Sequence, residues 1–240
     1  MYKNTMNYKR ILNEKLNEYL KKSYYLHILI DNFNLNNYTY GIVGGFVRDT
    51  ISEKNSIKDI DIIVDVDFEE LMYVLENYNI KYQHNTFKGL KIYDKTNNLY
   101  IDLWSLSDHR PFRQGYFKKS WKNIPKSSYI NCGGCIWIPN KNKLYLGKTK
   151  KFIKNKLVDF YNEKFFNSHH IDNKHIIAVK LLNYYEDCEY KLSESCMDFL
   201  KTYLSKQKHI TSIRKFAREN NIKVNINKFI AEQINEKITA

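Results

Sequence analysis

The spacing of apolar residues changes twice along the chain, from helical to strand-like and back to helical. Residues 7–31 carry apolar side chains at the spacing of an amphipathic helix, which we expect to pack against the rest of the protein. Short apolar runs then predict strands over residues 40–43, 57–64, 80–84, 90–93 and 99–106. Beyond Gly147, helical spacing predicts helices over residues 152–166, 172–186, 193–206, 209–220 and 225–238, with Asp172 and Ser193 as N-caps.

The first predicted strand is interrupted by glycines. It breaks at Gly44-Gly45 and continues as residues 46–51, which suit the first turns of a helix. Glycine lets backbone N–H groups approach an anion closely, and the positive end of the helix dipole points to the same place. This sequence therefore predicts a phosphate-binding turn.

The second predicted strand carries two acids, Asp59 and Asp61. Because side chains alternate along a strand, both carboxylates share one face, and the apolar residues between and after them share the other. Adjacent carboxylates repel each other unless a cation lies between them. The pair therefore predicts a Mg²⁺ site.

A further acid, Asp102, lies among apolar neighbours in the run over residues 99–106. A buried carboxylate without a partner is strongly destabilising, so we expect Asp102 to meet a cation or a lysine. A salt bridge at the edge of a sheet is the alternative to a metal site. Asp67 precedes a helical pattern that ends near residues 77–79, and it is predicted to be the N-cap of that helix rather than a third metal ligand.

Residues 105–129 interleave basic and aromatic side chains. This composition suits a surface that holds phosphates and stacks bases, but it also suits a solvated loop anchored by its aromatics. Cys132-Gly133-Gly134-Cys135 invites a zinc or redox interpretation, yet Cys188 and Cys196 lie far along the chain, so we do not favour a metal there. His169-His170 is interpreted as a surface pair.

The formal net charge is +13, which favours a polyanionic partner such as nucleic acid. Abundant Lys, Asn, Ile and Tyr offer a compositional alternative, an AT-rich genome. The sequence has no apolar run long enough to cross a bilayer, and its start lacks the apolar core of a signal peptide. We therefore expect a cytoplasmic protein with reduced cysteines and no membrane partner.

The glycine turn and the acidic strand together carry a family resemblance. Gly44-Gly45-Phe46-Val47-Arg48-Asp49, followed by Lys58-Asp59-Ile60-Asp61-Ile62, resembles the head-domain signature of bacterial poly(A) polymerases and CCA-adding tRNA nucleotidyltransferases, in the polymerase-beta-type superfamily. The resemblance implies an α+β fold, with a mixed sheet flanked by helices and a small helical domain after it. We accordingly expect an N-terminal helix over residues 1–36, a head domain over 37–147 and a neck- or body-like helical domain over 148–240.

The resemblance also implies a reaction and a set of site residues. Asp59, Asp61 and Asp102 would be catalytic and would hold two Mg²⁺ ions. The nucleotide would be bound by Gly44, Gly45, Arg48, Asp49, Arg110 and Asn131, where Asp49 either orients Arg48 or caps the helix. The enzyme would transfer NMP from an NTP, ATP or CTP, to an RNA 3′ end, tRNA above all, and release pyrophosphate.

Two family elements are altered in this chain. Lys126-Ser127-Ser128 stands where the two arginines and the aspartate of the family's RRDFTINAL segment would be, and no EDxxR motif follows. Specific CCA addition is therefore poorly supported. Two alternatives stay open: a nucleotidyltransferase toxin that modifies tRNA or protein, and a non-catalytic RNA-binding module on a decayed transferase fold.

Overall fold

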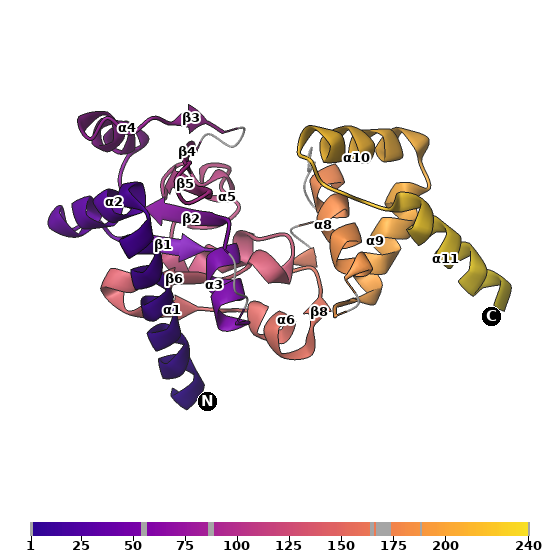
Figure 1. The fold of residues 1–240 in the computed structure, drawn as a ribbon. Coiled ribbons are helices and arrows are strands. Elements are labelled where there is room, and N and C mark those ends of the chain that lie inside the picture. The colour runs from indigo at the N-terminus through magenta and orange to yellow at the C-terminus, as the bar shows by residue number, and fades with distance from the viewer. Residues whose placement is uncertain are drawn as a thin grey trace. The chain divides into compact units, whose positions relative to one another are not determined.

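The computed structural model describes residues 2–53, 57–85, 89–163, 166, 174–187 and 189–239 (Figure 1). The chain divides into two compact units. Residues 1–128 and 132–149 form the first unit, and residues 129–131 and 150–240 form the second.

A mixed sheet organises the first unit. In the described residues it has seven strands, in the order β3-β4-β5-β2-β1-β6-β7. They are β1 (Tyr40–Val43), β2 (Asp59–Val64), β3 (Gln83–His84), β4 (Leu90–Asp94), β5 (Leu99–Ser105), β6 (Ile136–Ile138) and β7 (Lys143–Tyr145). β2 and β5 pair in parallel, and the other neighbours pair in antiparallel fashion. This mixed sheet confirms the predicted α+β class.

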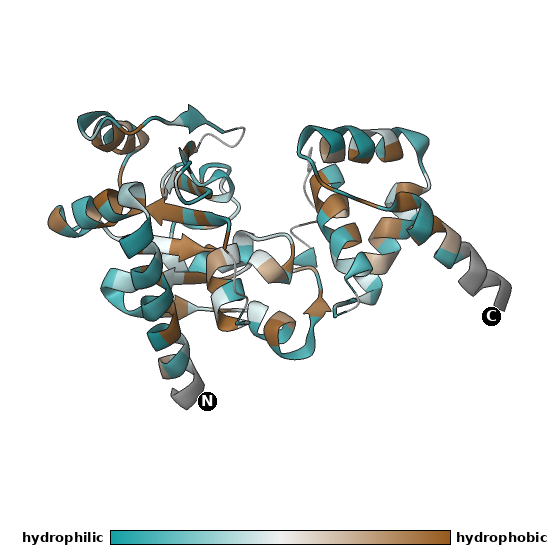
Figure 2. Ribbon diagram, viewed as in Figure 1, coloured by the Kyte–Doolittle hydropathy of each residue, from teal (hydrophilic) through white to brown (hydrophobic). Residues whose placement is uncertain are grey.

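Helices pack against this sheet and against one another. They are α1 (Tyr2–Lys22), α2 (Tyr24–Leu35), α3 (Gly45–Ile51), α4 (Phe68–Asn77) and the short α5 (Arg110–Arg113). α3 packs on β1 and β2, α4 packs on β5, and α1 packs on α2 and α3. In Figure 2 the strands β1 and β2 are largely brown, whereas the helices carry both brown and teal, as expected for elements with one apolar face.

The sequence predicted one helix over residues 7–31, and this prediction is wrong in one respect. The segment forms two helices, α1 and α2, which are separated by Ser23. The Ser23 side chain is fully buried; its Oγ accepts a hydrogen bond from the Leu26 backbone N–H at 3.3 Å and donates one to Asp94 Oδ2 at 2.6 Å. Ser23 is therefore the N-cap of α2 and ties the helix to the last residue of β4.

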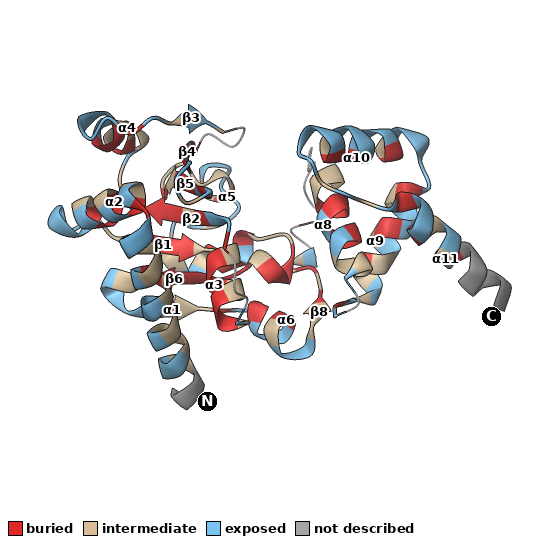
Figure 3. Cartoon of the chain, in the orientation of Figure 1, coloured by how far each residue is buried: buried red, intermediate tan, exposed pale blue. Residues whose placement is uncertain are grey.

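Ile60, Ile62 and Val64 share one face of β2 and are fully buried, which confirms the predicted alternation. In Figure 3 the ribbon of β2 changes from pale blue at its start to red at its end. The opposite face is covered at one end. There Ile63 belongs to a buried cluster with Leu106, Ile124, Ile136 and Ile138, and Val43, Trp104, Phe112, Trp121 and Tyr145 pack against it. Phe112 and Trp121 therefore anchor the basic segment to the sheet, as one of the two interpretations of residues 105–129 predicted.

The second unit is mainly helical. It contains the two-stranded pair β8 (Leu157–Val158) and β9 (Lys191–Leu192), most of α6 (Thr149–Asn155), and α8 (Lys174–Glu186), α9 (Glu194–Leu204), α10 (Gln207–Glu219) and α11 (Ile226–Thr239). α8 packs against α9 and α10. None of the described helices is both long enough and apolar enough to span a bilayer.

Two predictions for the second unit have different outcomes. The helix predicted over residues 152–166 is wrong, because α6 ends at Asn155 and Lys156, with a φ of 51°, turns the chain into β8. Ser193 caps α9 as predicted, and its Oγ accepts from the Cys196 backbone N–H at 3.3 Å. The proposed cap Asp172 lies outside the described residues, as do Cys188 and His169-His170.

Candidate active site

The glycine turn follows directly from the end of β1. Gly44 has φ 64° and ψ −121°, a conformation that residues with a side chain rarely adopt. A Cβ atom placed on Gly44 would lie 3.6 Å from Asp61 Oδ2, and one placed on Gly45 would lie 3.9 Å from Asp59 Oδ1. The backbone of the turn therefore passes immediately beside both acids of β2.

Cys135 holds this turn in place. The Gly44 N–H donates to the Cys135 carbonyl at 3.2 Å, and the Cys135 thiol donates to the Gly44 carbonyl at 3.4 Å. Complete burial raises the pKa of Cys135 to about 12, so the thiol stays protonated and remains a donor. Cys132 and Cys135 are both buried free cysteines, and sequence reasoning missed the positioning role of Cys135. The available signal was its place directly before the apolar run of β6.

Arg48 is fixed by its neighbour in sequence. Its Nε and Nη2 atoms donate to Asp49 Oδ1 and Oδ2 at 2.8 and 2.6 Å, and its Nη1 donates to the Cys132 carbonyl at 3.3 Å. The Arg48 and Asp49 side chains are only 19% and 18% exposed, so this bidentate pair is partly shielded from water. Of the two roles left open for Asp49, the structure shows that it orients Arg48.

Three carboxylates lie on the same face of the sheet. β2 and β5 run in parallel with Asp61 beside Asp102 and Asp59 beside Tyr100, and side chains at paired positions project to the same side. Asp59 is exposed, Asp61 is half-buried and Asp102 is 7% exposed. Asp102 therefore occupies the place beside the acidic pair that the family resemblance implied.

Asp102 meets a lysine, one of the two partners expected from the sequence. Lys91 Nζ lies 3.2 Å from Asp102 Oδ2, and Asn85 Nδ2 donates to Asp102 Oδ1 at 3.3 Å. The two strands pair with Lys91 directly opposite Asp102. Sequence reasoning did not single out Lys91 or Asn85, although Lys91 is a polar position between two apolar ones in a strand.

The carboxylates of Asp59 and Asp61 were predicted to form a Mg²⁺ site. No group of three or more His, Cys, Asp or Glu side chains in the described ranges is arranged to hold a metal ion. Asp59 and Asp61 nevertheless offer the hard oxygen ligands that Mg²⁺ prefers, and Mg²⁺ usually takes one or two carboxylates and completes its shell with water and substrate phosphates. The donor set therefore suits an ion that keeps part of its shell for water or a ligand rather than one held in a protein cage.

Arg110 and Asn131, the other two predicted nucleotide-binding residues, both make hydrogen bonds within the protein. Arg110 begins α5, and its Nε donates to Gln114 Oε1 at 3.2 Å. Asn131 belongs to the second unit and is 1% exposed; its Nδ2 donates to the Leu157 carbonyl at 2.9 Å and its Oδ1 accepts from the Asp159 N–H at 3.0 Å. The Asn131 amide therefore ties residues 129–131 to the backbone of residues 157–159 within the second unit.

The segment that departs from the family pattern has a structural role. Ser127 is buried, donates to the Ile124 carbonyl at 2.6 Å, and lies 2.7 Å from His109 Nε2. Burial lowers the pKa of His109 from 6.5 to about 4, so the imidazole is neutral at pH 7.

Asp67 is the N-cap residue of α4, as predicted, but its side chain makes no capping hydrogen bond.

The structure thus gathers most of the predicted site residues at one end of the sheet, around the turn after β1. These are Gly44, Gly45, Arg48, Asp49, Asp59, Asp61 and Asp102.

Comparison with known proteins shows a shared fold. Comparison with family models gave no match, and comparison with curated proteins gave none either. Among solved structures, a CCA-adding enzyme in complex with CTP matches with a TM-score of 0.62 at 16% identity, over 86% of this chain and 49% of that chain. The Thermotoga maritima CCA-adding enzyme complexed with tRNA matches with a TM-score of 0.60 at 15% identity, over 85% and 48%.

A tRNA-processing enzyme with CTP also matches, with a TM-score of 0.52 at 17% identity, over 72% of this chain and 44% of that chain. The chain therefore spans about half the length of the structures that it matches. These likenesses confirm the predicted resemblance at the level of the fold.

Proposed function

We propose that this protein is a Mg²⁺-dependent nucleotidyltransferase that transfers NMP from an NTP to an acceptor hydroxyl and releases pyrophosphate. The observation that carries the proposal is the convergence of the Gly44 turn with Asp59, Asp61 and Asp102 on one face of the sheet. The fold shared with CCA-adding enzymes supports the same reaction class.

The glycine turn and Arg48 would receive the triphosphate. Without side chains at Gly44 and Gly45, an anion can approach the backbone beside Asp59 and Asp61 closely. Because Asp49 holds the Arg48 guanidinium in a fixed orientation, a phosphate would not have to immobilise a flexible cation.

The carboxylates would hold the metal. Asp59 and Asp61 are the accessible ligands, and Asp102 would join them on the neighbouring strand. When bound, Mg²⁺ would promote deprotonation of the acceptor hydroxyl and neutralise charge on the leaving pyrophosphate. In its absence, Lys91 compensates the charge of the buried Asp102.

ATP or CTP is the proposed donor, and an RNA 3′ end, tRNA or a tRNA-like RNA, is the proposed acceptor. The supporting observations are the net charge of +13 and the fold neighbours solved with ATP, CTP and tRNA. The Asn131 amide is engaged with the protein backbone, so nucleotide recognition would not depend on it.

The test is a transfer assay with each labelled NTP, Mg²⁺ and total RNA. We expect label on RNA, loss of transfer in Asp61→Asn with RNA affinity retained, and normal transfer in Asp67→Asn. Asp67 is a matched control because it is an exposed acid that makes no capping hydrogen bond. Label on protein would support a toxin, and no transfer by the wild type with any NTP would support a non-catalytic RNA-binding module.

A further inference from the structure

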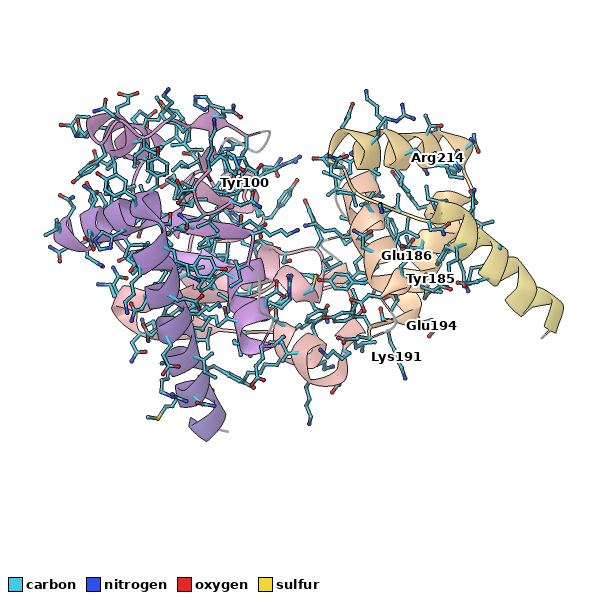
Figure 4. All side chains as sticks on the ribbon, viewed as in Figure 1. Tyr100, Tyr185, Glu186, Lys191, Glu194 and Arg214 are labelled. Carbon is cyan, nitrogen blue, oxygen red and sulfur yellow. The ribbon has the colours of Figure 1, made fainter. Side chains whose placement is uncertain are left out.

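Two tyrosines form an exposed stacked pair on the sheet. Tyr93 of β4 and Tyr100 of β5 are directly paired positions, and their ring centroids lie 4.6 Å apart with an interplanar angle of 21°. The residues are 40% and 39% exposed, whereas Leu99 and Ile101 on either side of Tyr100 are buried. Tyr100 is labelled in Figure 4. The pair therefore presents aromatic surface to solvent that the core of the sheet does not use.

This tyrosine pair lies beside the acidic residues. Tyr100 pairs with Asp59 across β2 and β5, and it precedes Asp102 by two positions, so it projects to the same face as both acids. Lys91 connects the two groups, because its Nζ lies 3.2 Å from Asp102 Oδ2 and 5.1 Å from the centroid of the Tyr100 ring. The Lys91 side chain is 41% exposed, so its ammonium remains accessible to a phosphate from solvent.

The strand order assigns the tyrosine pair to one side of the proposed reaction. The order β4-β5-β2-β1 puts the tyrosines on β4 and β5, the acids on β2 and β5, and the glycine turn after β1. In phosphoryl transfer the attacking and leaving oxygens lie roughly in line, on opposite sides of the transferred group. With the triphosphate at the glycine turn, the acceptor hydroxyl would approach from the side of the tyrosines.

We propose that Tyr93, Tyr100 and Lys91 form the subsite for the unpaired 3′-terminal nucleotides of a single-stranded polynucleotide acceptor. This inference rests on the proposed function and names its acceptor class. A terminal base stacks on the exposed aromatic surface, and a backbone phosphate contacts the Lys91 ammonium. Stacking on aromatics tolerates every base because each has a π-face, and Lys91 supplies the complementary charge. The acceptor hydroxyl of a protein has no backbone phosphate beside it to meet the Lys91 ammonium.

The test measures the affinity of the full chain for a fluorescently labelled single-stranded RNA oligonucleotide by anisotropy, at fixed salt and without NTP. Tyr100→Ala and Tyr93→Ala should each raise the Kd about tenfold, within the range that alanine substitution gives for base stacking. Tyr100→Phe should stay within about twofold of wild type because the ring is kept. Tyr73→Ala is the matched control, since Tyr73 on α4 is 59% exposed and lies outside the acidic site.

A second variant separates stacking from folding. Tyr100→Leu retains apolar cover on the strand but has no aromatic face, so it should weaken RNA binding as much as Tyr100→Ala does. An unchanged Kd in both variants would overturn the proposal, as would weakened NTP binding with RNA binding intact, because the tyrosines would then hold the donor base.

The outcome can be separated from that of the proposed function because binding is measured without transfer. Loss of transfer in Asp61→Asn together with unchanged RNA affinity in the tyrosine variants refutes the subsite and leaves the transferase standing. RNA affinity that depends on Tyr93 and Tyr100 in a wild type that transfers nothing supports RNA binding by the tyrosine pair but refutes the transferase. Transfer of label to protein in preference to RNA counts against the subsite.

Discussion

Substituting alanine at Gly44 should lower the stability of the protein, whereas the same change at Gly45 should leave stability intact and raise the KM for the NTP. At Gly44 the obstacle is the backbone, because its φ of 64° and ψ of −121° are unfavourable for alanine, whereas the added Cβ would meet Asp61 Oδ2 at an ordinary 3.6 Å. Strain of this kind costs about 1–3 kcal/mol. For a chain of this size, each kcal/mol lowers the melting temperature by about 2–4 °C. We therefore expect Gly44→Ala to lower the melting temperature by roughly 2–12 °C.

Gly45→Ala should leave the fold intact. Gly45 is not in the left-handed region, and its added Cβ would contact Arg48 Nη2 at 3.7 Å and Asp59 Oδ1 at 3.9 Å, which are ordinary distances. Alanine is also the better helix former, so the melting temperature should stay level or rise slightly. The new methyl group would, however, occupy space between Asp59 and Arg48 where the triphosphate is proposed to enter. We expect a higher KM for the NTP.

Two measurements test this pair of variants, a thermal melt followed by fluorescence and the KM for the NTP in the transfer assay. Gly45→Ala is the control for the backbone argument, because it adds the same methyl group at the next position without a positive φ. A Gly44→Ala protein as stable as wild type would show that the backbone at this position is not constrained. A Gly45→Ala protein with normal stability and an unchanged KM would show that the triphosphate does not lie against the turn.

Three further predictions concern single side chains. Lys91→Gln leaves the carboxylate of Asp102 without its cation and should destabilise the protein by about 1–2 kcal/mol, less than the loss of a fully buried pair because Lys91 is partly exposed. Mg²⁺ should then raise the melting temperature of this variant more than that of wild type, and an equal rise would contradict a contact between the metal and Asp102. Asp94→Ala removes a buried carboxylate that accepts four hydrogen bonds, from Ser23 Oγ, the Thr96 N–H, the Asn97 N–H and Asn97 Nδ2. Urea denaturation should show that the free energy of unfolding falls by about 2–4 kcal/mol, and a fall below about 1 kcal/mol would mean that water replaces these bonds. The pKa of His109 is about 4 in the folded state against 6.5 in the unfolded state, so the unfolded state binds the proton first and up to roughly 3 kcal/mol of stability should be lost as the pH falls from 6.5 to 4. His109→Gln should flatten this part of a plot of unfolding free energy against pH. An unchanged slope would mean that other groups cause the loss.

The sequence alone was sufficient for the features that depend on local periodicity. The alternation of Asp59 and Asp61 with Ile60 and Ile62 fixes which side chains share a face of β2, because the period of a strand is two residues. The glycine break after residue 43 likewise marks the end of β1 and the start of α3, because glycine supplies the backbone conformation that this turn needs.

The tertiary structure decided which residues meet across the sheet. Nothing within a strand reveals that Lys91 faces Asp102, that Tyr93 stacks on Tyr100, or that the Cys135 thiol bonds to the Gly44 carbonyl 91 positions away. The break between α1 and α2 has the same origin, since Ser23 is held by Asp94 at the end of β4, 71 positions along the chain. Such partners are chosen by strand register and packing between segments far apart in the chain, and a local pattern of apolar and polar residues contains no information about either.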